Sequence, residues 1–558
     1  MTESVESEQT IDPRRTALLE ARRALMQRFG AHPHAWSANG HTFGFQAPLT
    51  VPSQAGTYVR IHTDHGADFL GQITESRLTE RAGPEITADG ADGMGIELAQ
   101  ARVSSASFRL NIRMVEGGGT LLGRVTPQGI VPTTDADLFE DAELNRAPAA
   151  DVDRYLDGQF SNKVALDIGT IPDGDGTARA RLQASGFDRH TFLCGQSGSG
   201  KTYSLGLILE RILLESELPL VIIDPNSDFV RLGDARTFEQ ATRGFGGELT
   251  PEQYATLRAR YEAVAERVRV FRPVPRGQRS DRALRIRFSD LAPAIQGLVL
   301  RLDPLRDREE YHVLRTTIER LGRERYSIAD IQAAATATLS EDSLALARRI
   351  ANLGVDRWDV WAEADEPSVA DIGPSLDDAR ALVFDIGGFG TPEEKSLIAT
   401  ATLGAFWQLR ERREPVLIVI DEAHNVCAQE PADPLQAAAT ERAIRFAGEG
   451  RKFGLYLLMS TQRPQKIHRN VLSQCDNLVL MRMNSAADLA QLAEVFSFVP
   501  ASLMERASGF SQGESLVAGK IVPSPLLVRF GGRISQEGGS DVPTTWASPR
   551  PTPAGGDR

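Results

Sequence analysis

The sequence predicts an α/β protein built on a parallel sheet, preceded by a smaller all-β domain. From about Asp188 onwards, apolar runs typical of strands alternate with helical patterns. The runs LPLVIID, ALVFDIG and PVLIVID are continuously apolar, which indicates strands covered on both faces. From about Gly40 to Thr134, short β-type runs alternate with Gly- and Asp-rich turns, a texture that suggests a small barrel.

Length and composition restrict the class of protein. The chain has 558 residues, of which 41% are hydrophobic and 25% charged, so it can bury a large core. No run of eighteen apolar residues and no signal pattern is present, and the three cysteines have no zinc or disulfide spacing. We therefore expect a cytoplasmic protein with no membrane contact. The net charge of −13 argues against a wholly basic surface but allows a local basic strip.

Composition shifts divide the chain into segments. An amphipathic helix is expected at Ala17–Phe29, an acidic linker at Thr134–Asp153, and one or two strands near Val268–Arg272 and Leu284–Phe288 within a mostly helical stretch. The tail from Gly531 is rich in Gly, Ser, Pro and Thr, which is typical of disorder. The predicted organisation is an N-terminal helical segment at 1–39, a β-barrel with its linker at 40–150, an α/β domain at 151–530 with a helical insertion at about 237–376, and a disordered tail at 531–558.

One Gly-rich run fits the pattern of a phosphate-binding loop. It lies between an apolar strand and an amphipathic helix, so it is more than a turn that reverses the chain. Its glycines allow a tight turn that points backbone N–H groups at phosphate oxygens, and the helix N-terminus adds its dipole. We predict that ATP binds here, with Lys201 on the β- and γ-phosphates and the Thr202 hydroxyl on Mg²⁺. The predicted nucleotide-binding residues are Gly195, Gln196, Ser197, Gly198, Ser199, Gly200, Lys201 and Thr202.

Two acids follow the apolar strand PVLIVI. The carboxyl ends of strands in open α/β sheets face the ligand crevice, so Asp421 and Glu422 are expected beside the phosphate loop. Asp421 would hold the Mg²⁺ shell, and Glu422 would polarise the attacking water as a general base. The alternative, that both acids cap the next helix, is common for such pairs taken alone. His424 is more often a structural residue at such a position.

The next predicted strand, GLYLLMST, ends at Gln462. An amide at this position could orient water and sense the γ-phosphate, whereas the alternative is an ordinary polar residue at a strand end. The predicted catalytic set therefore includes Gln462 with Glu422.

The order of these motifs resembles the HerA family within the HerA/FtsK group of P-loop translocases. The resemblance rests on GQSGSGKT, IIDPNSDFVRL, LIVIDEAHNV and EGRKFGLYLLMSTQRPQKIHRNVLSQCDNLVLMRM, with the pair Arg189–His190 before the phosphate strand. It covers about 188–228 and 381–530 in detail, and the barrel, of the kind shared with ATP-synthase subunits, by texture only. It implies a RecA-like P-loop core and a homohexamer that threads double-stranded DNA.

The resemblance also implies that nucleotide lies between subunits and is completed by an arginine from the neighbour. Arg451 is the first candidate for that finger and Arg189 the second, because a guanidinium neutralises charge on the transferred phosphoryl group. The alternative for Arg451 is a cation that stabilises a helix C-terminus. The family's DPHGEY-like segment here begins at Asp224, and only its acid is kept, at Asp228. Lys466 and Arg469 are possible phosphate contacts, although solvated faces explain most such charges.

Three functions stay open on the sequence. The first is an ATP-driven DNA translocase or helicase that works with a separate nuclease or effector in DNA end processing, repair or antiphage defence, since the chain has no nuclease motif of its own. The second is an ATP-binding hexameric scaffold that regulates a partner enzyme. The third is a peptide-threading ATPase, which the 6% aromatic content and the lack of an aromatic loop disfavour.

Overall fold

The computed structural model describes residues 32–87, 107–172, 178–242, 249–322, 325–363 and 365–539. The predicted helix Ala17–Phe29 and residues 540–558 of the predicted tail lie outside these ranges. The described residues form two compact units. One contains residues up to Ser161 together with Pro172–Ala178 and Val499–Arg506, and the other contains Asn162–Ile171, Arg179–Phe498 and the residues from Ala507 onwards.

The N-terminal unit is built on antiparallel strands whose pairing closes on itself. The sheet order is β2-β1-β7-β3-β4-β5-β6, and β2 also pairs with β5, so six strands form a circuit of hydrogen-bonded neighbours. This circuit supports the prediction of a small barrel, which stays a prediction. The elements are β1 (His34–Ser37), β2 (Thr42–Pro48), β3 (Tyr58–His62), β4 (Asp68–Thr87), β5 (Ser107–Thr126), β6 (Gly129–Val131), β7 (Phe139–Arg146), α3 (Ala149–Phe160) and α16 (Ala501–Glu505).

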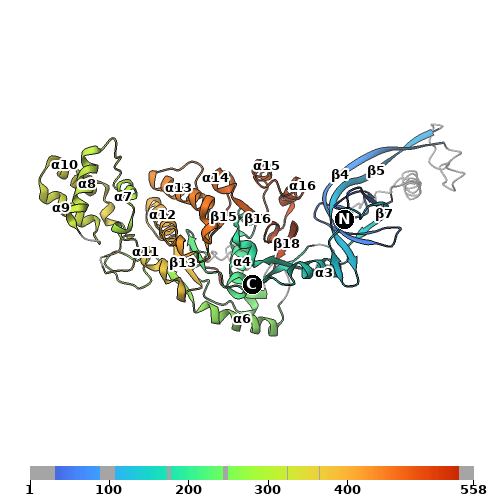
Figure 1. Ribbon diagram of the computed structural model, residues 1–558, viewed down its shortest axis with the longest axis horizontal. Helices are drawn as coiled ribbons and strands as arrows, with labels where there is room; N and C mark the ends of the chain where they lie inside the picture. Colours follow the sequence, from blue (N-terminus) through green and yellow to red (C-terminus); the bar gives the residue numbers. More distant parts are fainter. Residues whose placement is uncertain are drawn as a thin grey trace, which may run out of the picture. The chain divides into compact units, whose positions relative to one another are not determined.

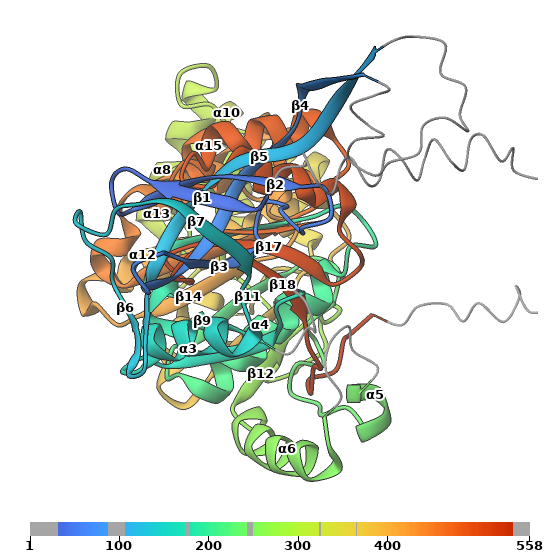
Figure 2. The same ribbon diagram turned by 90° about the vertical axis from the view of Figure 1, so that its right-hand side faces the viewer.

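Alternation of side chains gives this unit its core. Phe43 and Phe45 of β2, with Val59 and Ile61 of β3, point to one side and are buried together. Gly119 allows β5 to approach them, because a Cβ there would lie 2.4 Å from Phe43 Cζ. Figure 2 shows the long pair β4–β5 extending beyond the shorter strands of the same sheet.

The second unit contains the predicted α/β sheet. Its strand order is β12-β13-β11-β14-β15-β10-β16-β17-β18-β8-β9; the first seven strands are parallel and the last four antiparallel. The parallel strands are β12 (Val268–Phe271), β13 (Ala381–Asp385), β11 (Leu220–Asp224), β14 (Val416–Ile420), β15 (Leu455–Thr461), β10 (His190–Cys194) and β16 (Cys475–Met481). The antiparallel strands are β17 (Glu514–Gly519), β18 (Leu526–Phe530), β8 (Ala165–Thr170) and β9 (Arg179–Gln183). The hairpin β8–β9 is a part of the sheet that the sequence pattern did not single out.

Helices lie beside the parallel strands, as the apolar runs require (Figure 1). Every residue of β10, β11, β13 and β14 is buried. The helices are α4 (Lys201–Glu215), α12 (Pro392–Gln408), α13 (Pro434–Glu449), α14 (Arg469–Leu472) and α15 (Ala486–Val495). Thr391 and Glu394 form a capping box that starts α12, and Asp433 caps α13.

The predicted insertion is helical but does not interrupt the sheet. Its helices are α5 (Phe238–Thr242), α6 (Pro251–Ala265), α7 (Pro293–Val299), α8 (Arg308–Leu321), α9 (Ile328–Thr338), α10 (Glu341–Leu353) and α11 (Val369–Ile372). The expected strand near Val268–Arg272 is β12, which forms the sheet edge beside β13. The second possible strand, at Leu284–Phe288, does not form, so that expectation was wrong. In the described residues this stretch makes isolated bridges through Ala283 and Ile286, and no neighbouring strand continues the pairing.

The expected disorder from Gly531 was wrong for residues 531–539. Arg533, Ile534 and Ser535 are fully buried, and Ser535 bridges Ala235. Composition misled here because a few specific contacts, rather than apolar content, hold the segment against α4. No helix in the described part of the chain has the length and apolarity needed to span a bilayer.

Candidate nucleotide-binding site

The Gly-rich run forms a loop between the carboxyl end of β10 and the start of α4. Gly198 and Gly200 adopt φ of 75° and 93°, which residues with a Cβ rarely reach, and Gly200 is the residue before α4. Gly195 has no room for a side chain, because a Cβ there would lie 2.7 Å from Met481 Cβ. The loop thus presents its backbone at the N-terminus of a fifteen-residue helix, where anions are stabilised.

Lys201 connects the loop to the acidic strand end. Its Nζ lies 2.9 Å from Asp421 Oδ1 and 3.2 Å from Glu422 Oε1, and it donates to Ser460 Oγ at 3.1 Å. Only β15 separates β10 from β14, and the strands are parallel, so their carboxyl ends meet at one edge. Burial by itself would lower the pKa of Lys201, but the two carboxylates hold that pKa above its usual value.

Glu422 is held in an unusual backbone conformation. Its φ is 42°, in the left-handed region that a residue with a Cβ adopts at a cost. Its Oε2 lies 3.2 Å from His424 Nδ1. Burial would raise the pKa of the Glu422 carboxyl, but His424 and Lys201 lower it overall, so the side chain is ionised at neutral pH, as a general base must be.

The residues predicted for Mg²⁺ have the chemistry to hold it. Asp421 Oδ2 is buried and has no hydrogen-bond partner among the described residues, which leaves its lone pairs available. The Thr202 hydroxyl lies 3.5 Å from Asp228 Oδ2 on the other side of the loop. The described residues contain no cluster of three or more His, Cys, Asp or Glu arranged as a metal site. Asp421 and Thr202 are thus a small set of protein ligands. Such a set fits Mg²⁺, which usually takes one or two protein ligands and fills its other coordination positions with phosphate oxygens and water.

Asp224 and Asp228 divide two tasks between them. Asp224 is fully buried and accepts backbone N–H groups of Phe229 at 2.8 Å and of Asp228 at 3.0 Å, so it shapes the turn after β11. Burial raises the pKa of Asp224 to about 7, despite these bonds. Asp228 faces Thr202, and burial together with the Asp421 charge raises its pKa to about 6. Asp228, the acid that this chain keeps from the DPHGEY-like segment, therefore lies beside the phosphate loop.

Gln462 directly follows β15 and is half-buried. Since β15 is the neighbour of β14 in the sheet, Gln462 lies at the same sheet edge as the acidic pair. Thr461, the last residue of β15, has its hydroxyl 3.0 Å from His424 Nδ1. His424, for which the sequence favoured a structural role, thus contacts Glu422 itself.

Arg189 and Arg451 lie at the opposite edge of the sheet. Both precede the first residues of their strands, β10 and β15, whereas the phosphate loop follows the last residue of β10. A five-residue strand separates these edges by about 16 Å. The structure brings the two arginines together on one carboxylate: Asp476 Oδ2 lies 2.6 Å from Arg451 Nη1 and 3.5 Å from Arg189 Nε.

His190 has a structural role. Its Nε2 donates to Ala447 O at 2.9 Å, and its Nδ1 accepts from Leu457 N at 3.0 Å. Burial lowers its pKa to about 4, so the ring is neutral at neutral pH.

Two arginines near the loop were missed by sequence reasoning. Arg482, the residue after β16, donates from Nη2 to Gly198 O at 3.3 Å. The carboxyl-end rule that located Asp421 could have found it, since β16 is parallel to β10. Arg533 is fully buried and its Nη1 lies 3.5 Å from Thr202 O. No motif marks Arg533, because its segment is far from α4 in sequence.

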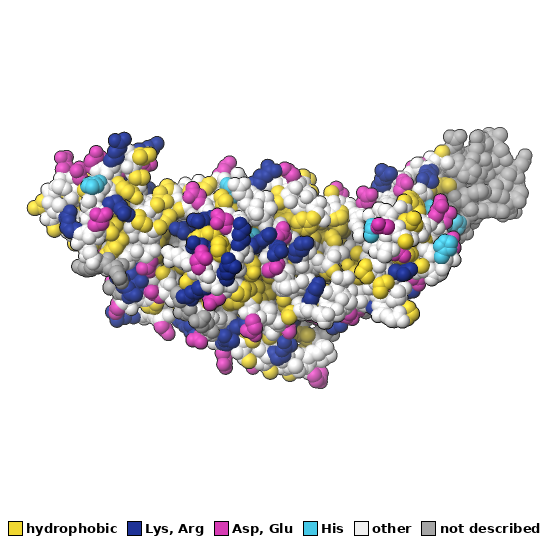
Figure 3. Space-filling view, viewed as in Figure 1, with side chains coloured by type: hydrophobic (Ala, Val, Ile, Leu, Met, Phe, Trp, Pro, Cys, Tyr) yellow, Lys and Arg dark blue, Asp and Glu magenta, His cyan; other side chains and the backbone are white. Residues whose placement is uncertain are grey.

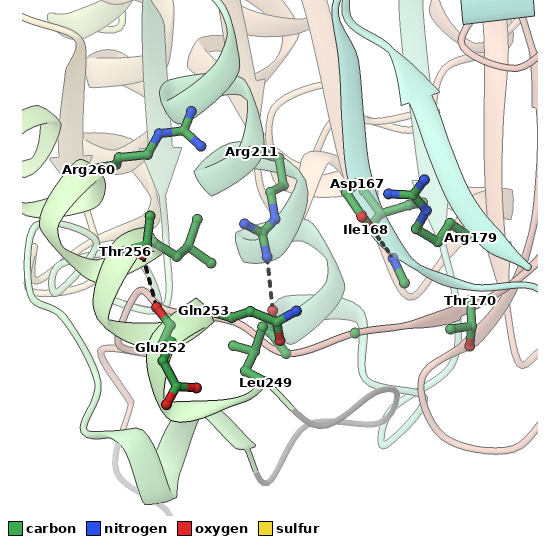
Figure 4. Close-up of a pocket in the computed structure, with 14 residues that line it drawn as sticks. Asp167, Ile168, Thr170, Arg179, Arg211, Leu249, Glu252, Gln253, Thr256 and Arg260 are labelled. Atoms are coloured by element: carbon green, nitrogen blue, oxygen red, sulfur yellow. Dashed lines mark hydrogen bonds between the residues drawn. The ribbon is translucent and has the colours of Figure 1, made fainter. Parts of the chain in front are cut away.

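A cavity of about 660 Å³ lies away from this chemistry (Figure 4). Arg211 projects toward it from α4, ten residues beyond Lys201, or about 15 Å along the helix. Two of its cations already have partners: Arg211 Nη2 donates to Gly532 O at 3.3 Å, and Arg260 Nη2 to Glu215 Oε2 at 2.9 Å. The phosphate loop therefore stays the candidate nucleotide site.

The chain is similar to known proteins over part of its length. Residues 166–367 match the family model described as "Helicase HerA, central domain". The DNA double-strand break repair helicase HerA of Sulfurisphaera tokodaii is 33% identical over 127 residues, which are 23% of this chain and 25% of that protein. The HerA of Pyrococcus furiosus is 31% identical over 117 residues, covering 21% of this chain and 20% of the relative. The resemblance to HerA is therefore confirmed, over about a quarter of the relatives' length.

Two solved structures are also similar to the chain. VirB4 of Thermoanaerobacter pseudethanolicus has a TM-score of 0.42 at 15% identity, with 66% of this chain and 96% of that one covered. The conjugative coupling protein TrwB has a TM-score of 0.42 at 12% identity, with coverage of 70% and 94%.

Proposed function

We propose that this chain, whose residues 166–367 match the central domain of HerA helicases, is an ATP-hydrolysing translocase or helicase of double-stranded DNA. The observation that carries the proposal is the buried contact of Lys201 with Asp421 and Glu422 at the carboxyl ends of β10 and β14. A phosphate-binding lysine, a metal-binding acid and a general base are thereby within reach of one phosphoryl group.

Each group has a distinct task in hydrolysis. The loop N–H groups and the start of α4 hold the phosphates, and Lys201 Nζ moves from the two acids to the β- and γ-phosphate oxygens. Thr202 and Asp421 would hold Mg²⁺, which would supply positive charge to the phosphates. Glu422, released from Lys201, accepts a proton from the attacking water, and Gln462 orients that water.

The remote arginines support an oligomeric ring. Arg189 and Arg451 cannot reach the phosphate loop of their own chain, since they lie at the amino edge of the sheet. A neighbour in a head-to-tail ring can present that edge to the loop. We propose a homohexamer in which Arg451, or Arg189 beside it, completes the adjacent site.

DNA is the proposed cargo, and a separately encoded nuclease or effector the proposed partner, in DNA repair or antiphage defence. The relatives are named as DNA double-strand break repair helicases. Figure 3 shows Lys and Arg side chains gathered over the middle of that view, where the ATPase unit lies, despite the net charge of −13. A local basic surface can bind a phosphate backbone whatever the net charge.

The second candidate is an ATP-binding hexameric scaffold for a partner enzyme. It is favoured by the N-terminal unit, a compact domain in which the sequence shows no catalytic motif. A scaffold needs no general base, so the buried contacts of Glu422 favour the motor.

The deciding experiment is ATP turnover by the purified protein with and without linear double-stranded DNA. Glu422→Gln serves as the control for contaminating ATPase. We expect turnover that DNA stimulates and that the variant lacks. Turnover indifferent to DNA would favour the scaffold, and turnover equal in the Glu422→Gln variant would contradict the proposed ATPase.

A further inference from the structure

A second cavity, with a mainly polar lining, lies beside the loop that begins with Glu422. It measures about 440 Å³ and lies between the loop after β14 and the loop after β15. His424 lines it from the first loop, and Arg463 and Lys466 from the second. This volume lies within the range of ligand-binding cavities.

The two loops are fixed to each other by backbone contacts. Ala428 and Ile467 form an antiparallel bridge, His468 N donates to Cys427 O at 2.7 Å, and Gln429 N donates to Lys466 O at 2.8 Å. The walls are therefore preorganised, which reduces the entropy lost when a ligand binds.

The cavity walls favour an anion. In the described parts of the chain, neither Arg463 nor Lys466 makes a side-chain ion pair, whereas nearby Arg469 is paired with Glu494. Of the described residues that line the cavity, Glu430 is the one acid. Gln429 and Gln465 add amide groups. Two free cations with neutral hydrogen-bonding groups are the chemistry that recognises a phosphate group.

One hydroxyl connects the cavity to the catalytic base. Thr461 Oγ1 accepts from Arg463 N at 3.0 Å and lies 3.0 Å from His424 Nδ1. His424 Nδ1 in turn lies 3.2 Å from Glu422 Oε2. The hydrogen bond of His424 Nδ1 is made with Thr461 Oγ1, whereas Glu422 Oε2 has no hydrogen-bond partner among the described residues and lies within ion-pair distance of the same nitrogen. A shift of the Arg463 backbone therefore changes the support of the Glu422 side chain.

We propose that this cavity binds a phosphodiester group of a nucleic-acid backbone, and that His424 is a positioning residue that transmits its occupation to Glu422. The coupling rests on the proposed ATPase function. The binding of nucleic acid by Arg463 and Lys466 rests on DNA as the proposed cargo but not on ATP hydrolysis, so the two can fail separately.

The first test measures binding of a fluorescently labelled, blunt-ended duplex by anisotropy at several salt concentrations. The variant is Arg463→Gln/Lys466→Gln, and the matched control is Arg306→Gln/Lys520→Gln, two exposed cations elsewhere in the unit. We expect the first variant to bind about tenfold more weakly, with a slope of log affinity against log salt lower by about one to two. Affinity and slope equal to those of the control would overturn the site. Competition by polyglutamate as strong as by unlabelled duplex would overturn the assignment to a phosphodiester.

The second test separates positioning from packing. Asparagine places its amide where Nδ1 of histidine lies, whereas glutamine reaches the position of Nε2. We expect His424→Asn to keep the ratio of DNA-stimulated to unstimulated ATP turnover, and His424→Gln to lose it, with both rates measured at saturating duplex. If both variants keep the ratio, or both lose it equally, the positioning role is overturned.

The Glu422→Gln variant distinguishes the two levels of failure. If wild-type turnover survives in that variant, the proposed ATPase fails, while duplex binding still reports on the cavity. If Glu422→Gln abolishes turnover but the duplex neither binds nor stimulates the wild type, the ATPase stands and the cavity proposal is overturned.

Discussion

Lys201 shows at the residue scale how the fold prepares a site for phosphate. A buried lysine would ordinarily lose its charge, but Asp421 and Glu422 lie within 3.2 Å and keep it protonated. Phosphate oxygens can replace these carboxylates as partners of Nζ, which frees Asp421 for Mg²⁺ and Glu422 for water.

Substitutions at these positions should separate binding from chemistry. We expect Lys201→Ala to weaken ATP binding by about 10- to 100-fold, the range for one charge-assisted contact. Glu422→Gln should bind ATP near normally and hydrolyse it about 10²- to 10⁴-fold more slowly. Equilibrium binding of a fluorescent ATP analogue and steady-state turnover measure the two effects. Near-normal ATP affinity in Lys201→Ala would contradict the loop assignment.

Asp228 predicts a pH dependence of stability. Its pKa is raised to about 6 in the fold, so the fold favours the protonated form. The stabilising contribution is complete below the unfolded pKa near 3.8 and is lost as the pH rises through about 6. Asp228→Asn should therefore stabilise the protein at pH 8 by about 1 kcal/mol after allowance for solvent screening, and by less at pH 5. Thermal melting at both pH values tests this, and an equal change in Tm at both would contradict it.

At the element scale, the segment 531–539 holds α4 through contacts with Thr202, Gly206 and Glu210. Arg533 donates from Nη1 to Glu537 at 3.1 Å and from Nε to Ser535 Oγ at 2.7 Å. Glu210 Oε2 accepts the backbone N–H groups of Ile534 and Ser535. Gly206 makes room, because a Cβ there would lie 2.1 Å from Arg533 Cζ. The segment also reaches the site, since Gly538 N donates to Asp228 O at 2.8 Å.

Arg533→Met should destabilise the protein strongly, because it leaves buried acceptors without their charged partner. The expected loss is about 3 kcal/mol. Arg529→Met, at an exposed position on β18, is the matched control and should change stability by less than about 0.5 kcal/mol. Chemical denaturation of both variants measures the difference, and equal stabilities would show that the segment does not hold α4.

At the scale of the whole molecule, the two edges of the sheet have different tasks. The carboxyl edge carries the phosphate loop and the acids, and the amino edge carries Arg189, Arg451 and their shared partner Asp476. Within one chain the two arginines lie too far from the phosphate loop to contact a phosphoryl group there. In the proposed ring they would face the phosphate loop of the next subunit.

Mixing two inactive variants tests this arrangement. Arg451→Ala should reduce turnover by about 10³-fold or more while rings still form. Combined with Lys201→Ala, it should recover activity, because some interfaces then pair an intact Lys201 with an intact Arg451. The absence of recovery at every ratio, with mixed rings present, would argue against a role across the interface.

Removing the N-terminal unit tests its role in assembly. A chain that begins at Asn162 keeps the phosphate loop and both acids, so we expect ATP affinity near that of the full chain. Oligomer size or partner binding should be impaired, as measured by light scattering and pull-down of a defined partner. Unchanged assembly and partner binding would contradict the proposed role of this unit.

The sequence by itself determined the central sheet and which residues of the candidate site come together. Its evidence is local: the spacing of GQSGSGKT fixes a loop after a strand, and the runs before Asp421 and Gln462 can only be buried strands. Since parallel strands share one carboxyl edge, the meeting of Lys201 with Asp421 and Glu422 followed from order alone.

Only the tertiary structure decided what depends on contacts between distant segments. Arg533 reaches α4 across more than three hundred residues, His424 contacts Glu422 through a left-handed turn, and Arg189 and Arg451 share Asp476. Such contacts carry no periodicity and no fixed spacing, because side chains from separate elements meet only after the sheet has set their positions. For the same reason, composition predicted disorder at residues 531–539, whereas specific hydrogen bonds order them.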